Sequence, residues 1–195
     1  MTEPPDSRPR SVQTVRGMVV SLTLLVLVAL ALAGLAGQCS FSPGGPDISG
    51  AVAPTVNAQA ELHGLARAAA FPVRVPQLPP GWQATSADRD RVGKAPNSPV
   101  AVWVGWLTPR SAYLRLSQSS ASGADLVTSE IGARPTATGA VRVRQTNWAV
   151  YTAPNGERVW VADLGAVRLL ITGSAGEPEM RTLATATLAA PIAPR

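Results

Sequence analysis

Residue types that carry catalysis or bind metals are scarce in this chain. Its 195 residues include one histidine, His63, and one cysteine, Cys39. His63 is the only imidazole that a Ser–His–acid triad could use, and no Gly-x-Ser-x-Gly motif is present. The same counts exclude a zinc site built from several Cys or His side chains of one chain. We therefore predict no catalytic residue, no metal site and no cofactor, and interpret His63 as an ordinary helix residue.

Closely spaced carboxylates are the next candidates for chemistry. Asp88 and Asp90 lie two residues apart, a spacing at which their oxygens could bind a hard cation. Arg89, Arg91 and Lys94 interleave with them, and no closing Glu follows. This pattern favours a solvated charged loop. The chain also lacks a Walker motif and a dinucleotide-binding glycine fingerprint, so a nucleotide enzyme is not expected.

The arginines suggest a binding surface. Lys and Arg number 17 against 12 Asp and Glu, which gives a net charge of +5. Several arginines lie in segments that alternate like strands, and Arg142 and Arg144 lie opposite Val141 and Val143. If helices cover the apolar face of a sheet, its other face is basic and could attract anionic lipid headgroups or acidic polymers. The candidate anion-binding residues are Arg115, Arg142, Arg144 and Arg168. The alternative is ordinary solvent-facing arginine, and without a recognition motif we expect no nucleic acid partner.

Tryptophan is unusually frequent, with five Trp against two Phe and two Tyr. All five lie on or next to predicted strands: Trp82, Trp103, Trp106, Trp148 and Trp160. They could form an aromatic face for sugars or acyl chains, or fill a core between a sheet and helices. Because side chains alternate along a strand, Trp103 and Trp106 point to opposite faces. We therefore favour a role in the core.

An uncharged apolar segment, residues 18–36, is the clearest positional signal. As a helix its 19 residues would span about 28 Å, close to the thickness of a bilayer core. Arg8, Arg10 and Arg16 precede it, and the next cation after it is Arg67. This asymmetry predicts a cytoplasmic N-terminus and an extracytoplasmic C-terminal part, so we expect a single-pass protein of the cell membrane.

Two other fates of the apolar segment stay open. It could be a cleaved signal peptide, although it is longer than the usual apolar region of such peptides. It could also direct lipid attachment at Cys39, although Gln38 replaces the small residue that lipoprotein signals place before the cysteine. Cys39 could alternatively remain a free thiol or link two chains.

Composition divides the rest of the chain. Residues 1–15 are predicted to be a disordered cytoplasmic tail, 16–37 the transmembrane helix, and 38–54 a flexible stalk rich in Gly, Pro and Ser. Residues 55–195 are predicted to form an extracytoplasmic domain, which is long enough to bury a core.

Periodicity indicates an α+β domain in which helices pack on one face of an antiparallel sheet. Helices are expected at about 56–70, 123–131 and 177–190, the last with a capping box from Ser174 to Glu177. About seven strands, packed by two or three helices, are expected at 82–87, 100–107, 113–118, 140–145, 147–152, 157–163 and 166–173. The pairs 100–107 with 113–118 and 147–152 with 157–163 are predicted hairpins, the second turning at Asn155-Gly156. The strand order is not predicted.

Short motifs in a fixed order support a family resemblance. They are Val15-Arg16-Gly17-Met18-Val19, Pro79-Pro80-Gly81-Trp82, Val104-Gly105-Trp106-Leu107-Thr108-Pro109, Tyr113, Leu116-Ser117-Gln118-Ser119, Trp148 and Ile171-Thr172-Gly173-Ser174-Ala175. With them, residues 11–190 resemble actinobacterial single-pass membrane proteins that carry domain of unknown function 4245. The resemblance implies an envelope protein of uncharacterised role and supplies no catalytic residue.

The sequence therefore favours a membrane-anchored, non-catalytic binding or protein-interaction module outside the cytoplasmic membrane. Its expected partners are the bilayer, through residues 18–36, and an unknown envelope protein or an anionic lipid or polymer. The alternative is a carrier of lipid or another hydrophobic ligand, with a pocket between sheet and helices. A hydrolase that uses His63 is a third hypothesis.

Overall fold

The computed structural model describes residues 17–28, 55–132 and 136–194. The chain divides into two units, Met1–Ala51 and Val52–Arg195. In the first unit, residues 17–28 form a helix in which the Thr23 hydroxyl donates to the Val19 carbonyl at 2.8 Å. Within the described ranges, no helix is both long enough and apolar enough to span a membrane. The expected tail (1–15), the stalk (38–54) and most of the second half of the 18–36 segment lie outside the described residues.

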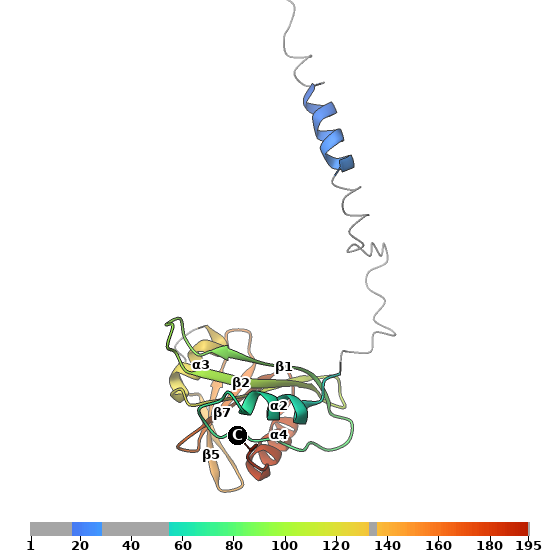
Figure 1. The fold of residues 1–195 in the computed structure, drawn as a ribbon. Helices are drawn as coiled ribbons and strands as arrows, with labels where there is room; N and C mark the ends of the chain where they lie inside the picture. The colour runs from blue at the N-terminus through green and yellow to red at the C-terminus, as the bar shows by residue number, and fades with distance from the viewer. Residues whose placement is uncertain (1–16, 29–54, 133–135, 195) are drawn as a thin grey trace, which may run out of the picture. The chain divides into compact units, whose positions relative to one another are not determined.

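The second unit is built on one seven-stranded sheet in the order β1-β2-β3-β7-β6-β5-β4, with every neighbouring pair antiparallel (Figure 1). The strands are β1 (Gln83–Arg91), β2 (Val100–Leu107), β3 (Tyr113–Ser119), β4 (Gly139–Val143), β5 (Thr146–Thr152), β6 (Arg158–Asp163) and β7 (Arg168–Gly173). The expected number of strands is thus confirmed.

Strands that are consecutive in the sequence form most of the pairs in the sheet. Both predicted hairpins are present, because β2 pairs with β3 and β5 pairs with β6. Gly156, in the turn between β5 and β6, has a φ of +83°, a conformation that glycine adopts without strain. Pairing of β3 with β7 joins the β1-β2-β3 half of the sheet to the β4–β7 half.

Three helices, α2 (Ala58–Ala66), α3 (Gly123–Ile131) and α4 (Glu177–Ala189), pack on this sheet. Buried side chains of α2 and α4, such as Leu62 and Leu183, join the larger core on one face. In contrast, Leu126 and Val127 of α3 pack with residues of the opposite face. The expectation that helices cover a single face is therefore wrong: α3 lies on the other side from α2 and α4 (Figure 1).

Three of the five tryptophans are buried in the larger core. Trp106, Trp148 and Trp160 are at most 3 % exposed, and the rings of Trp148 and Trp160 lie 6.4 Å apart. Trp82 and Trp103 are half-buried. The predicted core role is thus confirmed for Trp106, Trp148 and Trp160. They lie on the side of the sheet that α2 and α4 cover.

Several element boundaries differ from the sequence-based expectation. β1 continues to Arg91, so Asp88 and Asp90 lie in a strand and not in a loop; they pair with Trp103 and Ala101 of β2. Backbone pairing with a neighbouring strand outweighs the local preference of these charged residues. The first helix is also shorter than expected: it begins after Asn57, whose side chain accepts from the Ala60 N–H, and it ends at Ala66.

The last predicted cap is wrong as well. Helix α4 begins after Gly176, which provides no side-chain cap. The Ser174 hydroxyl instead accepts from the Tyr113 N–H at 3.1 Å, and so belongs to the end of the β3–β7 pairing. Glu177 and Glu179 lie in the first turn of α4, where their negative charge suits the positive end of the helix dipole.

Candidate functional site

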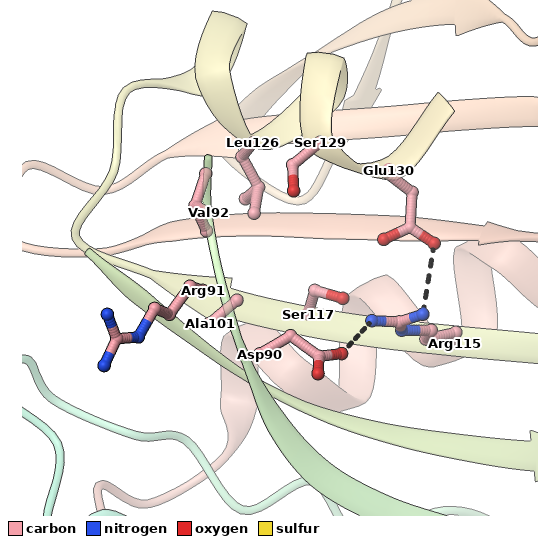
Figure 2. A pocket seen from close by; sticks show the side chains of 9 residues that line it. All are labelled: Asp90, Arg91, Val92, Ala101, Arg115, Ser117, Leu126, Ser129 and Glu130. Atoms are coloured by element: carbon pink, nitrogen blue, oxygen red, sulfur yellow. Dashed lines mark hydrogen bonds and ion pairs between the residues drawn. The ribbon is translucent and has the colours of Figure 1, made fainter. Parts of the chain in front are cut away.

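A cleft of about 260 Å³ lies between α3 and the sheet (Figure 2). Its walls come from three strands and one helix, and are lined by Asp90, Arg91, Val92, Ala101, Arg115, Ser117, Leu126, Ser129 and Glu130. We call this the α3 cleft. Charged and hydroxyl side chains from segments far apart in the sequence meet in it.

The alternation of side chains along β3 determines which residues form the floor of the cleft. Leu114, Leu116 and Gln118 of β3 face the α2–α4 side, so Arg115 and Ser117 face α3. Asp90 lies near the end of β1, level with Ala101 of β2, and lines the same cleft. The register of the β1-β2-β3 half therefore places a carboxylate, a guanidinium and a hydroxyl below α3.

Helix α3 supplies the remaining acid. Its start is capped by Ser122, whose hydroxyl oxygen accepts from the Asp125 N–H at 3.1 Å. Its end is closed by Gly132, which has a φ of +72°. Between these caps, Leu126 and Val127 are buried against the sheet, and Glu130 in the last turn reaches the cleft.

Arg115 is the centre of an ion-pair cluster. Its Nη1 lies 3.5 Å from Glu130 Oε1, and its Nη2 lies 3.4 Å from Asp90 Oδ2 (Figure 2). The guanidinium also lies over the Trp103 ring, 4.3 Å from its centroid. Trp103 Nε1 donates to the same Asp90 oxygen at 2.7 Å. These contacts hold Asp90 and Arg115 in place and leave Glu130 with one long ion pair.

Burial raises the pKa of the Glu130 carboxyl above its ordinary value. The nearby Arg115 opposes this rise, whereas the negative charges of Asp90 and Glu157 add to it. The attraction of Arg115 therefore does not fully offset the cost of removing the Glu130 carboxylate from solvent.

Two polar atoms in the cleft have no hydrogen-bond partner within the described ranges. One is the hydroxyl of Ser117, a residue that is 1 % exposed, and the other is Nε of Arg115. Figure 2 shows the Ser117 hydroxyl on the side of the cleft where Arg115 lies. Buried polar groups normally find partners, so the Ser117 hydroxyl marks a place where a hydrogen bond is still available.

A second pocket, of about 370 Å³, adjoins the first. It shares Arg115 and Glu130 with the α3 cleft, and adds Tyr113, Glu157 and Thr172 among its lining residues. The Arg115–Glu130 pair thus separates two hollows under α3. Glu157 brings a third carboxylate to the region.

With the site described, comparison with known proteins places the chain in a family. A family model described as a protein of unknown function (DUF4245) matches residues 10–187. The chain belongs to the DUF4245 family. No curated protein and no solved structure matches it. The matched range includes every residue of the α3 cleft in this DUF4245 protein, and it confirms the domain that the sequence motifs indicate.

The predicted basic residues of the DUF4245 chain do not form one cluster. Arg115 and Arg168 face the α3 side, but each has acidic partners; Arg168 Nε lies 3.2 Å from Asp163 Oδ2. The Gly165 N–H, together with Arg168, lowers the pKa of the Asp163 carboxyl. Arg142 is exposed on β4, at the far edge of the sheet from β1.

Arg144 lies outside the strand that the sequence pattern predicts for it. β4 ends at Val143, and Arg144 lies in the following turn with a φ of +54°. It is exposed there, one residue after the strand that carries Arg142. The structure thus gathers Arg142 and Arg144 at one edge and separates them from Arg115 by β5, β6 and β7.

His63 lies far from the α3 cleft in the fold. It is exposed on α2, which packs on the face of the sheet opposite to α3. His63 and Ser117 therefore do not form a nucleophile–base pair. Among the described residues no group of three or more His, Cys, Asp or Glu is placed to hold a metal ion.

Sequence reasoning considers Asp90 only as a cation ligand beside Asp88, and it does not identify Ser117 or Glu130 as site residues. The local pattern places Asp90 in a loop and makes Glu130 one polar position on a short helix. The available signal is Arg115: an arginine inside a strand needs a neighbouring acid when a helix covers it. Which acids meet it depends on the side of the sheet on which α3 packs.

Proposed function

We propose that this DUF4245 protein is a membrane-anchored binding or protein-interaction module outside the cytoplasmic membrane, and that the α3 cleft is its binding site. Support for the location comes from the sequence. Residues 18–36 carry no charge, and Arg8, Arg10 and Arg16 precede them without a matching cluster after them. The family resemblance to single-pass envelope proteins points the same way.

The buried, unpartnered Ser117 hydroxyl carries the binding assignment. It lines an open cleft together with Asp90, Arg115 and Glu130, four polar side chains from three separate elements. Such convergence of a few polar groups in a concave site is typical of ligand recognition.

Binding without catalysis accounts best for these groups. The cleft presents carboxylates, a guanidinium and hydroxyls, and the chain's one imidazole lies on the other face of the sheet. A serine nucleophile needs an adjacent base that can take its proton. Ser117 has no hydrogen bond to such a base within the described residues.

The carrier alternative has less support. It requires space between the sheet and the helices α2 and α4, but large side chains such as Trp148, Trp160 and Met180 fill that layer. A hollow with two tryptophans among its lining residues, Trp82 and Trp106, lies beside the start of α2. This hollow is a polar surface groove, because it is also lined by Thr55, Asn57 and Gln59.

An anionic polymer or lipid headgroup as partner rests on Arg142 and Arg144. Both are exposed at the β4 edge. This edge would act as a second, electrostatic contact beside the α3 cleft. Substituting both arginines by glutamine should then weaken association with acidic envelope material and leave binding in the cleft unchanged.

Photo-crosslinking in the cells that make the protein tests the binding role. A photoreactive amino acid is placed at Ser129, an exposed residue at the rim of the cleft, and at Ala68, an exposed residue after α2, as the matched control. We expect a discrete crosslinked product from position 129 and none from position 68. Equal labelling from both positions, or none from either, would overturn the assignment of the cleft.

Thiol labelling tests the location. Ser129→Cys is made in a Cys39→Ser background, so that the chain holds a single thiol. A membrane-impermeant maleimide should label intact cells to the same extent as opened cells. Labelling that appears only after the cells are opened would contradict the extracytoplasmic placement.

A further inference from the structure

We infer that the α3 cleft takes a cationic group, a primary ammonium or a guanidinium, from the ligand or partner. This inference rests on the proposed binding function and specifies the ligand chemistry of the same site. It is carried by the charges that line the cleft, the end of α3, and the free hydrogen-bonding capacity of Ser117.

The charged residues that line the two adjoining hollows under α3 sum to a negative charge, although the chain as a whole is positive. Asp90, Glu130 and Glu157 line the two adjoining hollows, and Arg115 lies between them. Arg91 also borders the cleft, but its guanidinium donates to the Pro96 carbonyl and points away from the other lining residues in Figure 2. The carboxylates therefore outnumber the guanidinium that faces them, in a chain of net charge +5.

The end of α3 adds to this negative potential. The last carbonyls of a helix lack intrahelical partners and carry the negative end of the helix dipole. A basic residue often occupies this position, but the last turn of α3 has none. Glu130 lies in that turn, so a cation at the cleft would approach both the carboxylate and the helix end.

Ser117 is the independent observation that points to a ligand. It is 1 % exposed, its hydroxyl has no partner among the described residues, and it lines the same cleft. A hydroxyl oxygen has two lone pairs and can accept from an N–H group of an ammonium or guanidinium. A ligand cation placed between Ser117 and Glu130 would satisfy both.

An anion fits the cleft less well. It would have to approach Arg115, whose Nε has no partner among the described residues, but Asp90 and Glu130 already flank that guanidinium at 3.4 and 3.5 Å. Like charges at such separations repel, and more strongly where solvent is partly excluded. The volume of about 260 Å³ is below that of most sites for drug-sized ligands, so the occupant is a single side chain or a small amine.

Trp103 provides a direct readout. Its indole N–H donates to Asp90, so a cation that binds Asp90 and Glu130 should shift its ¹H–¹⁵N signal. The full chain in detergent micelles is titrated with n-butylammonium, with acetyl-Gly-Lys-Gly-amide, and with sodium acetate at matched ionic strength. The Trp103 signal is assigned by its loss in Trp103→Phe.

We expect a saturable shift with both cationic probes and none with acetate. Glu130→Gln should weaken the binding by about tenfold, the effect expected when one charge-assisted hydrogen bond is lost. Ser117→Ala should weaken it by a smaller factor. Glu61→Gln, which removes the same charge from the exposed surface of α2, serves as control and should leave the binding unchanged.

The two cationic probes separate the possible sources. Tighter binding of the lysine peptide than of butylammonium supports a protein partner, and equal binding supports a small amine. A saturable shift with acetate alone would overturn the cationic inference. The absence of a saturable shift with all three probes would overturn it as well. Crosslinking from Ser129 would still stand in that case, so failure of this inference can be distinguished from failure of the binding role.

Discussion

The side-chain amide of Gln118 makes two hydrogen bonds to the backbone of Arg74. The Arg74 N–H donates to Gln118 Oε1 at 2.8 Å, and Gln118 Nε2 donates to the Arg74 carbonyl at 2.8 Å. Gln118 is fully buried on the α2–α4 side of β3. Its amide thus completes the hydrogen bonding of a segment that pairs on its other edge with the chain around Ile192.

Replacement of Gln118 by leucine should destabilise the domain. The change leaves both backbone groups of Arg74 without a side-chain partner in a buried layer, at a cost of about 2–4 kcal/mol. Urea unfolding of the full chain measures the free energy. Gln59→Ala, at an exposed position of α2, should change it by less than about 0.5 kcal/mol. An unchanged stability for Gln118→Leu would mean that the bridge to Ile192 suffices to hold the segment.

Two glycines should respond in opposite directions to alanine. Gly173 has a φ of +141°, and a Cβ atom there would overlap the Tyr113 carbonyl of the neighbouring strand β3. Gly173→Ala should therefore cost about 3 kcal/mol or more. Gly64 lies inside α2, and nothing lies within 4 Å of a Cβ atom there. Gly64→Ala should stabilise by about 0.5–1 kcal/mol. Thermal unfolding of the two variants tests the contrast, and a tolerated Gly173→Ala would refute the close approach of β3 and β7.

Glu130 predicts a pH dependence of stability. Because burial raises the folded-state pKa of Glu130 above the ordinary value of 4.5, the folded protein binds this proton more tightly than the unfolded chain does. This stabilisation is complete below the unfolded-state pKa and is lost as the pH rises through the folded-state pKa. Glu130→Gln cannot ionise, so it should unfold at a higher temperature than the wild type at neutral pH, and the difference should shrink as the pH falls below the ordinary pKa.

The charge-matched control for Glu130→Gln is Glu61→Gln on the exposed side of α2. It should show no such convergence between neutral and acidic pH. If Glu130→Gln were less stable than the wild type at neutral pH, attraction to Arg115 would outweigh the burial of the carboxyl, and the pKa of Glu130 would be lowered instead of raised.

Trp148 combines a large buried ring with an unsatisfied donor. The residue is fully buried, and its indole N–H has no partner among the described residues. Phenylalanine removes this donor and keeps an aromatic ring, so Trp148→Phe should cost less than about 1.5 kcal/mol. Trp148→Ala leaves a cavity and should cost about 3–5 kcal/mol. Equal losses in urea unfolding would indicate that the indole N–H makes a stabilising hydrogen bond.

Local patterns are sufficient to predict most elements of the fold. A continuous apolar run identifies the strand that carries Val102, and alternation identifies the strand that carries Leu116. Asn155-Gly156 identifies a hairpin because its backbone preference is intrinsic to the dipeptide. The same reasoning fails at Asp90, where pairing with Ala101 of β2 overrides a composition typical of loops. It also fails at Ser174, because the partner of its hydroxyl is Tyr113, far away in the sequence.

Short-range periodicity and composition are enough to predict the set of elements, the α+β class and the residue types available for chemistry. The side of the sheet that α3 covers and the pairing of β3 with β7 depend on packing of the whole domain. These choices minimise the free energy of the whole chain and leave no local signature. They bring Asp90, Arg115 and Glu130 together. Arg115, which the sequence suggests as an anion-binding residue, is therefore paired with two carboxylates in the α3 cleft.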